Sequence, residues 1–160
     1  MTILQKAGTA IDLDRYSLRR FLKEIEALGE LETHDEPVDL ADLAQHFEGS
    51  PKAVYFRKAG PEGAELIGNV TASRARIARA FNTTPDKLLH EILRRLDNRP
   101  QMIEVSRAEA PVQQVVLTGD DADLTRLPAH LQHGLDGAPY ISAGVDIVRD
   151  PATGLTNVGM

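Results

Sequence analysis

The stretch LPAHLQHGLDGAPYISAGVDIVRDPATGLTNVGM, residues 127–160, decides how the rest of the chain is interpreted. Asp-Gly and Asp-Pro pairs favour turns, so a turn is predicted at residues 136–137 and a tight connection at residues 150–154. The apolar run between them predicts a long strand over residues 139–149. A second strand is predicted over residues 155–160, where the chain stops. The pattern therefore predicts a β-hairpin that is one part of a larger sheet.

Composition narrows the class of protein. The 160 residues suit one ordinary domain, or one small domain plus part of another. A formal net charge of -6 argues against nucleic-acid binding, which needs a surplus of Lys and Arg. Cysteine is absent, which excludes disulfides, thiolate metal sites and Cys nucleophiles. The sequence has neither an apolar signal segment nor a run of membrane-spanning length, so we expect a soluble, cytoplasmic protein without a membrane partner.

Four helices are predicted from apolar residues that recur on one helical face. They cover residues 17–29, 39–49, 73–81 and 84–99. Ser17, Asp39 and Thr84 can act as N-caps, and Pro85 suits the first helical position. Gly29 can take the left-handed position that follows a helix end.

Short extended segments lie between these helices. They cover residues 31–38, 53–56 and 65–70, and the breaker GPEG at residues 60–63 separates the last two. Interleaved helices and strands describe a small α/β or α+β domain. We therefore predict a loose arm over residues 1–16, an N-terminal α/β domain over residues 17–108 and a β-rich region over residues 109–160. That region is expected to open with a strand at residues 112–117.

Three clusters of polar residues have a functional and a structural interpretation. The basic residues between positions 74 and 99 can form an anion-binding face, but such a run is more often the solvated side of a helix pair. The residues concerned are Arg74, Arg76, Arg79, Lys87, Arg94, Arg95 and Arg99. His130 and His133 have metal-ligand spacing only on a helix, which Pro128 and Gly134 disfavour. The third cluster is Asp120, Asp121 and Asp123. It lacks the further oxygens of a calcium loop, so a cap and turn before Leu124 is favoured.

Ser142 and Asn157 are the two candidate site residues of the hairpin. Ser142 is a small hydroxyl in an apolar strand, and it either allows close strand approach or lines a ligand. Asn157 is an amide in a strand, and it either caps the turn or contacts a phosphate-bearing ligand together with Ser142. A regular hairpin sets Asn157 opposite about Ile147, which is roughly 17 Å along the strand from Ser142. Both can touch one ligand only if that ligand is long or a bulge shifts the register.

Several short motifs occur in a fixed order along the chain. They are SLRRFL at 17–22, GEL at 29–31, DEPV at 35–38, IGNV at 67–70 with SR at 73–74 and IA at 77–78, LP at 127–128, DGAPYISAG at 136–144, RDP at 149–151 and TNVGM at 156–160. In this order and spacing the whole chain resembles the N-terminal part of the UbiD family of reversible decarboxylases, which use prenylated flavin mononucleotide. The TNVGM wording looks more like the branch that acts on aromatic acids.

The resemblance implies a fold, an activity and a ligand set. The expected fold is a small N-terminal α/β domain followed by the first strands of a flavin-reductase-like split β-barrel, truncated at residue 160. The expected activity is non-oxidative decarboxylation of aromatic or α,β-unsaturated carboxylic acids. At the position of Asn157 the family has one of three protein ligands to a divalent metal, usually Mn²⁺, which bridges to the flavin phosphate; K⁺ is a further candidate ion. Ser142 would lie against the cofactor, and the backbone of Val158, Gly159 and Met160 would follow it.

The resemblance also implies what lies outside these residues. In the family the catalytic Arg, the His and Glu metal ligands and the catalytic carboxylates come after the position of Met160, so no catalytic residue is assigned here. We expect an N-terminal fragment of a carboxy-lyase that is inactive by itself, and that forms a homo-oligomer and receives its cofactor from a flavin prenyltransferase when full length. The alternative is a non-catalytic α/β module that pairs with a partner chain.

Overall fold

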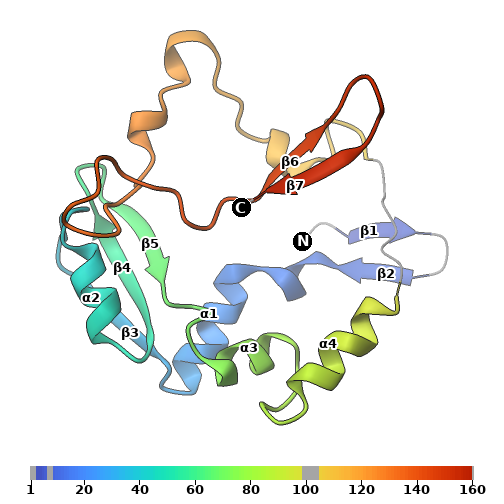
Figure 1. Cartoon of the computed structure of the whole chain (residues 1–160), viewed down its shortest axis with the longest axis horizontal. Coiled ribbons are helices and arrows are strands. Elements are labelled where there is room, and N and C mark those ends of the chain that lie inside the picture. The colour runs from blue at the N-terminus through green and yellow to red at the C-terminus, as the bar shows by residue number, and fades with distance from the viewer. Residues whose placement is uncertain (1–2, 7–8, 99–104, 160) are drawn as a thin grey trace.

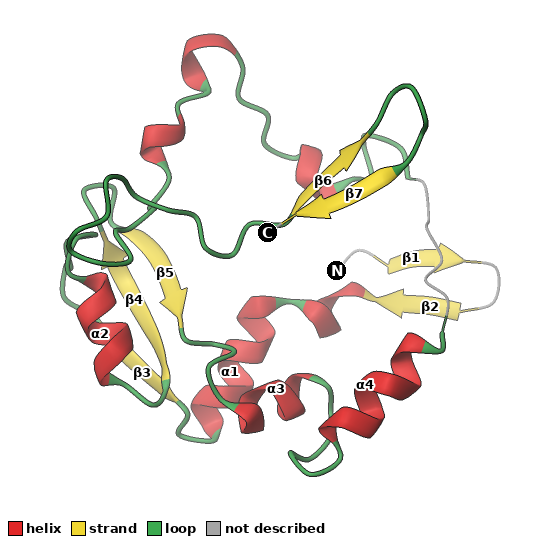
Figure 2. Cartoon of the chain, viewed as in Figure 1, coloured by secondary structure: helices red, strands yellow, loops and turns green. Residues whose placement is uncertain are grey.

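The computed structural model describes residues 3–6, 9–98 and 105–159. Its largest sheet has three strands, β3 (Leu31–His34), β4 (Ala53–Ala59) and β5 (Ala64–Gly68), in the order β3–β4–β5. β3 is parallel to β4, and helix α2 (Leu43–Gly49) lies in the connection between them, as a parallel pair requires a crossover. β5 returns antiparallel to β4 through the turn at residues 60–63. The predicted mixed α/β fold class is confirmed (Figures 1 and 2).

The three other helices are α1 (Leu18–Ala27), α3 (Arg74–Ala80) and α4 (Leu88–Leu96). Gly29 takes the predicted left-handed conformation after α1, with φ of 71°. Two helices begin later than predicted. The Asp39 carboxylate accepts a hydrogen bond from the Ala41 N–H at 2.8 Å, which makes a local turn, and Asp42 becomes the N-cap of α2. Similarly, residues 84–87 form a turn and Lys87 becomes the N-cap of α4.

The hydrophobic core lies between the sheet and α2. Leu43, Val54, Phe56 and Ala59 are buried together, and Val38, Leu40, Phe47 and Leu66 pack around them. Burying each large apolar side chain contributes about 1.5–3 kcal/mol, so this small cluster is the main source of stability for the sheet. The core is mostly aliphatic, as expected from a content of 4% aromatic residues.

Arg76 corrects the interpretation of the basic cluster as a solvated helix face. Its side chain is only 2% exposed. Its guanidinium donates hydrogen bonds to the carbonyls of Val70, Pro51 and Asn69 at 2.9–3.2 Å and forms an ion pair with Glu30 at 2.8 Å. It therefore joins α3 to the ends of three other segments. The other described members of the cluster that form ion pairs lie on the solvated side of their helices, as expected. Arg79 pairs with Glu24, and Arg94 and Arg95 pair with Glu91.

The region over residues 109–159 contains less strand than predicted. Residues 111–113 form a 3-10 helix, so the strand expected at residues 112–117 is wrong. The strand expected over residues 139–149 is shortened to β6 (Asp146–Arg149), which pairs antiparallel with β7 (Thr156–Gly159). Strand propensity is expressed only where a neighbouring strand accepts the ladder. Among the described residues, no strand pairs with residues 112–117, and Tyr140 forms only an isolated bridge with His130. The expected split barrel therefore stays a prediction.

The predicted loose arm contains regular structure. Strands β1 (Ile3–Lys6) and β2 (Thr9–Asp12) form an antiparallel hairpin, followed by a 3-10 helix at Leu13–Tyr16. The proposed limits of the arm and of the two domains remain predictions. No helix in the described residues is long and apolar enough to cross a lipid bilayer.

Candidate functional site

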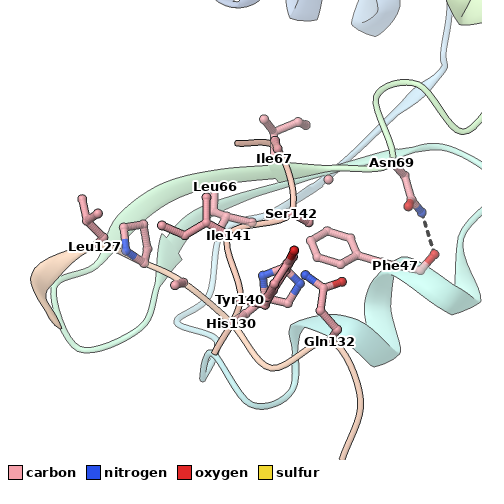
Figure 3. Close-up of a pocket in the computed structure, with 14 residues that line it drawn as sticks. Phe47, Leu66, Ile67, Asn69, Leu127, His130, Gln132, Tyr140, Ile141 and Ser142 are labelled. Carbon is pink, nitrogen blue, oxygen red and sulfur yellow. Dashed lines mark hydrogen bonds between the residues drawn. The ribbon is translucent and has the colours of Figure 1, made fainter. Parts of the chain in front are cut away.

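A pocket of about 470 Å³ lies where the N-terminal sheet meets residues 127–143 (Figure 3). Its walls come from α2, from the end of β5 and from the segment that was predicted to carry the site. Ser142 is among its lining residues, and its contact with a cofactor stays a prediction. The lining residues include no Asp, Glu, Lys or Arg. The pocket is therefore mainly apolar, with a few polar groups.

Phe47 forms the wall on the side of α2, and its ring points toward His130 and Tyr140 in Figure 3. The Phe47 and His130 ring centroids are 5.5 Å apart, and Phe47 also packs edge-on against the buried Phe56 at 5.6 Å. Asn69 fixes the end of the helix, because its amide donates to the Phe47 carbonyl at 2.6 Å. Asn69 has a left-handed backbone with φ of 57°, which suits Asn better than most residues. The wall is thus held by contacts on both sides.

Gly68 is required for this arrangement, and its replacement by Ala is expected to be destabilising. A Cβ at position 68 would lie 2.5 Å from Cζ and 2.6 Å from Cδ1 of the Phe47 ring. The ring would have to leave its place between Phe56 and His130, and overpacking of this kind costs about 1–3 kcal/mol. Urea unfolding of Gly68→Ala measures the loss.

Gly49→Ala is the matched control, because a Cβ there meets no atom within 4 Å. Gly49 lies in α2, where Ala has the better helix propensity, so this variant should be neutral or slightly more stable. Equal stability of the two variants would contradict the proposed close contact between Gly68 and Phe47.

His130 is half-buried in the pocket and pairs through its backbone with Tyr140, whose N–H donates to the His130 carbonyl at 3.1 Å. Burial lowers the pKa of its imidazole below the ordinary value, because removal from water disfavours the charged form. The ring is therefore neutral at pH 7 and adds no charge to the pocket.

This lowered pKa predicts a stability that falls as the solution is acidified. The unfolded chain takes up the His130 proton near pH 6.5, while the folded chain resists it until a lower pH. Between these values the unfolded state binds more protons, so acid favours unfolding. NMR titration should place the His130 transition below pH 6.5, and the unfolding free energy of His130→Gln should depend less on pH over this window than that of the wild type. A transition above pH 6.5 would contradict the prediction.

The other predicted site residues lie outside this pocket. Asn157 is exposed on β7 and lies opposite Val148, one residue from the expected position near Ile147. A turn at residues 142–143 interrupts the chain, and the estimate of the Ser142–Asn157 separation along a continuous strand does not apply. Val158 and Gly159 are exposed on the same strand, which Figure 1 draws apart from the β3–β4–β5 sheet. Met160 lies outside the described residues.

The acidic cluster and the two histidines take the structural roles that were favoured. Asp123 accepts a hydrogen bond from the Thr125 N–H at 2.9 Å and caps the short 3-10 helix Leu124–Arg126. His130 and His133 lie in irregular chain rather than on a helix. Within the part of the chain that is described, no three His, Cys, Asp or Glu side chains are grouped so as to hold a metal ion.

Two family models match the chain over adjoining regions. The 3-octaprenyl-4-hydroxybenzoate carboxy-lyase N-terminal domain of UbiD matches residues 22–96, and the Rift-related domain of the same carboxy-lyase matches residues 103–160. The chain belongs to the UbiD family. Together the models include the N-terminal sheet, the pocket and the hairpin that carries Asn157.

Individual relatives agree with this assignment. An uncharacterised protein from the cooM 5′ region of Rhodospirillum rubrum is 30% identical over 149 residues, and anhydromevalonate phosphate decarboxylase of Methanothermobacter thermautotrophicus is 28% identical over 146 residues. Both alignments cover 89% of this chain and 32% of the relative, so the chain spans about a third of the length of these curated relatives. Among solved structures, an evolved dimeric form of the UbiD-class enzyme HmfF from Pelotomaculum thermopropionicum, in complex with prFMN, has a TM-score of 0.79 and 25% identity. That match covers 89% of this chain and 34% of HmfF.

Proposed function

We propose that these 160 residues form part of a UbiD-like carboxy-lyase that removes CO₂, reversibly and without net oxidation, from an aromatic or α,β-unsaturated carboxylic acid. The observation that supports it most is the fold match to HmfF in complex with prFMN, which extends over 89% of this chain. The family description names a hydroxybenzoate carboxy-lyase, and one relative is named as a decarboxylase. A prenylated flavin mononucleotide and a divalent metal, Mn²⁺, are the proposed cofactors.

The hairpin suits the proposed role in holding the metal and the phosphate. The Asn157 side chain is exposed on β7, and no hydrogen bond to another described residue engages its amide. Its oxygen is a hard donor of the kind that Mn²⁺ accepts, and the metal would offset the charge of the phosphate. The backbone of Val158, Gly159 and Met160 would follow the nucleotide, and the Ser142 hydroxyl would touch it from the pocket side.

When bound, the modified flavin supplies the electron-accepting chemistry that loss of CO₂ requires. The residues of this chain would bind and orient: Asn157 fixes the phosphate end through the metal, and Ser142 contacts a second point of the same molecule. Catalytic acid and base groups are expected from other residues, because the resemblance sets the Arg, His and Glu of the family after position 160.

A chimera tests the proposal. The present chain replaces the matching third of HmfF, and the product is coexpressed with a flavin prenyltransferase. We expect the chimera to purify with the flavin absorbance and to decarboxylate the substrate of HmfF, while the 160-residue chain alone retains little flavin and turns over nothing. Turnover by the isolated chain would overturn the assignment of catalysis to other residues. A folded chimera without flavin would overturn the proposed cofactor role.

A partner-binding module is the second candidate, and the exposed apolar surface of residues 112–158 favours it. Val112 is 80% exposed and Ile147 is 71% exposed, which is unusual for side chains of this size in such number. A partner chain that supplies further strands would cover them. Coexpression of this chain with the remaining two thirds of HmfF as a separate polypeptide should then give a complex that elutes as one species. Separate elution of two folded chains would exclude this candidate.

A further inference from the structure

The pocket described above has the size and lining of a small-molecule site. Its volume of about 470 Å³ is several times that of an apolar cavity of roughly 150 Å³, which is enough to bind benzene. Its walls carry the rings of Phe47, His130 and Tyr140, together with aliphatic side chains such as Leu66 and Ile141. Flat aromatic molecules pack well against such rings, so the shape favours an aromatic ligand.

One polar group in this pocket makes no hydrogen bond to the described part of the chain. Among the described residues, the Gln132 amide nitrogen, Nε2, is a buried donor that makes no hydrogen bond. Figure 3 shows this amide directed toward His130 and the Phe47 ring, on the inner side of the pocket. A buried donor without an acceptor is destabilising, and a bound oxygen atom would relieve that cost.

The charge of the lining decides which oxygen is suitable. No Lys or Arg lines the pocket, and the half-buried His130 is neutral at pH 7 because its pKa is lowered. A carboxylate would lose its hydration here without gaining a cation in return. A neutral carbonyl or amide oxygen loses less hydration free energy when it is buried.

We propose that this pocket binds a small neutral aromatic molecule that carries a carbonyl or amide oxygen, with Gln132 Nε2 as the hydrogen-bond donor. The site goes beyond the proposed decarboxylase function, and its occupancy requires no flavin, metal or turnover. Failure of either proposal can therefore be recognised separately.

Binding is tested with the ¹⁵N-labelled 160-residue chain and three probes: benzamide, benzoate and toluene. Benzamide should shift the amide signals of residues 127–143. It should bind at least about tenfold more tightly than benzoate, because burial of one uncompensated charge costs more than the free energy of a tenfold ratio. Toluene fills the apolar space without an acceptor and should bind more weakly than benzamide.

The Gln132→Leu variant removes the donor and keeps an apolar side chain of similar size. It should weaken benzamide binding by about five- to tenfold and change toluene binding by less than about twofold, because one hydrogen bond is lost. Retained toluene binding also shows that the variant is folded. Gln114→Leu, a change at an exposed position outside the pocket, is the matched control and should leave all three affinities unchanged.

Three results would overturn the proposal: no binding of benzamide, equal binding of benzoate and benzamide, or unchanged benzamide affinity in Gln132→Leu. The HmfF chimera adds a fourth. If benzamide binds to the 160 residues but not to the flavin-free chimera, further polypeptide fills the pocket and it is not a ligand site.

Discussion

Replacement of Arg76 with Ala is expected to lower the free energy of unfolding by about 3–5 kcal/mol. The expected loss follows from how the guanidinium is used. Glu30 remains 43% exposed and can be hydrated after the change, so the lost ion pair is the smaller part of the effect. The larger part comes from the carbonyls of Asn69, Val70 and Pro51, which lose a buried donor and gain a cavity in its place.

Arg79→Ala is the control for Arg76→Ala, because it removes the same side chain from the same helix. Arg79 is 50% exposed and pairs with Glu24 at 3.3 Å, so its loss should cost less than about 1 kcal/mol. Arg76→Lys keeps the charge, but the lysine cannot bond to every acceptor of the guanidinium. Its loss in free energy of unfolding should lie between those of Arg76→Ala and Arg79→Ala. Urea unfolding followed by circular dichroism gives all three values, and similar losses for positions 76 and 79 would refute the structural role of Arg76.

The four helices could be predicted because their signals are local. The apolar stripe of α1 and the left-handed Gly29 depend on neighbours within a few residues. The starts of α2 and α4 could not be predicted as well, since Asp39 and Thr84 bond to nearby backbone in turns rather than to the first turn of a helix. Such local alternatives differ little in energy, and the sequence alone does not rank them.

Strand predictions failed where no strand in the described part of the chain forms a ladder with the segment. Val112, Val115 and Val116 have high strand propensity but are exposed. Residues 111–113 form a 3-10 helix, and residues 114–117 are irregular. The strand propensity of a residue mainly reflects how well its side chain packs on a half-buried sheet, so it has little effect in a segment outside a sheet. By contrast, β4 was predicted as a short run and is lengthened to Ala59, since β3 and β5 pair with it on both sides.

The pocket depends on contacts that the sequence does not display. Ser142 was found because it stands out in an apolar segment, but Phe47 and Gln132 were not, as each becomes significant only when α2 meets residues 127–143. One signal was available: Gly68 lies in a strand, where glycine often marks the close approach of another group. That group is the Phe47 ring. The burial of Arg76 had no comparable signal, because its acceptors are backbone carbonyls from distant segments.

Replacement of Asn157 with Ala in the HmfF chimera is expected to weaken Mn²⁺ binding by at least about tenfold to a hundredfold, with a parallel loss of flavin at purification. Even groups that only support a metal ligand contribute this much to affinity, so a ligand should contribute no less. The fold should be unaffected, because Asn157 is exposed and surface changes usually alter stability by less than about 0.5 kcal/mol. Binding would be measured by titration of the metal-free chimera, followed by the flavin absorbance.

Two further variants separate coordination by Asn157 from a general effect of losing an amide. Asn157→Asp keeps an oxygen at the same position and adds a negative charge, so it should retain the metal. Asn98→Ala removes an exposed amide that bonds only to the Arg94 carbonyl among the described residues, and it should leave metal and flavin binding unchanged. If Asn157→Ala binds both as tightly as the parent chimera, the hairpin does not hold the cofactor. The resemblance at residues 156–160 would then reflect shared fold alone, because a ligand that can be removed without loss of affinity is not a ligand.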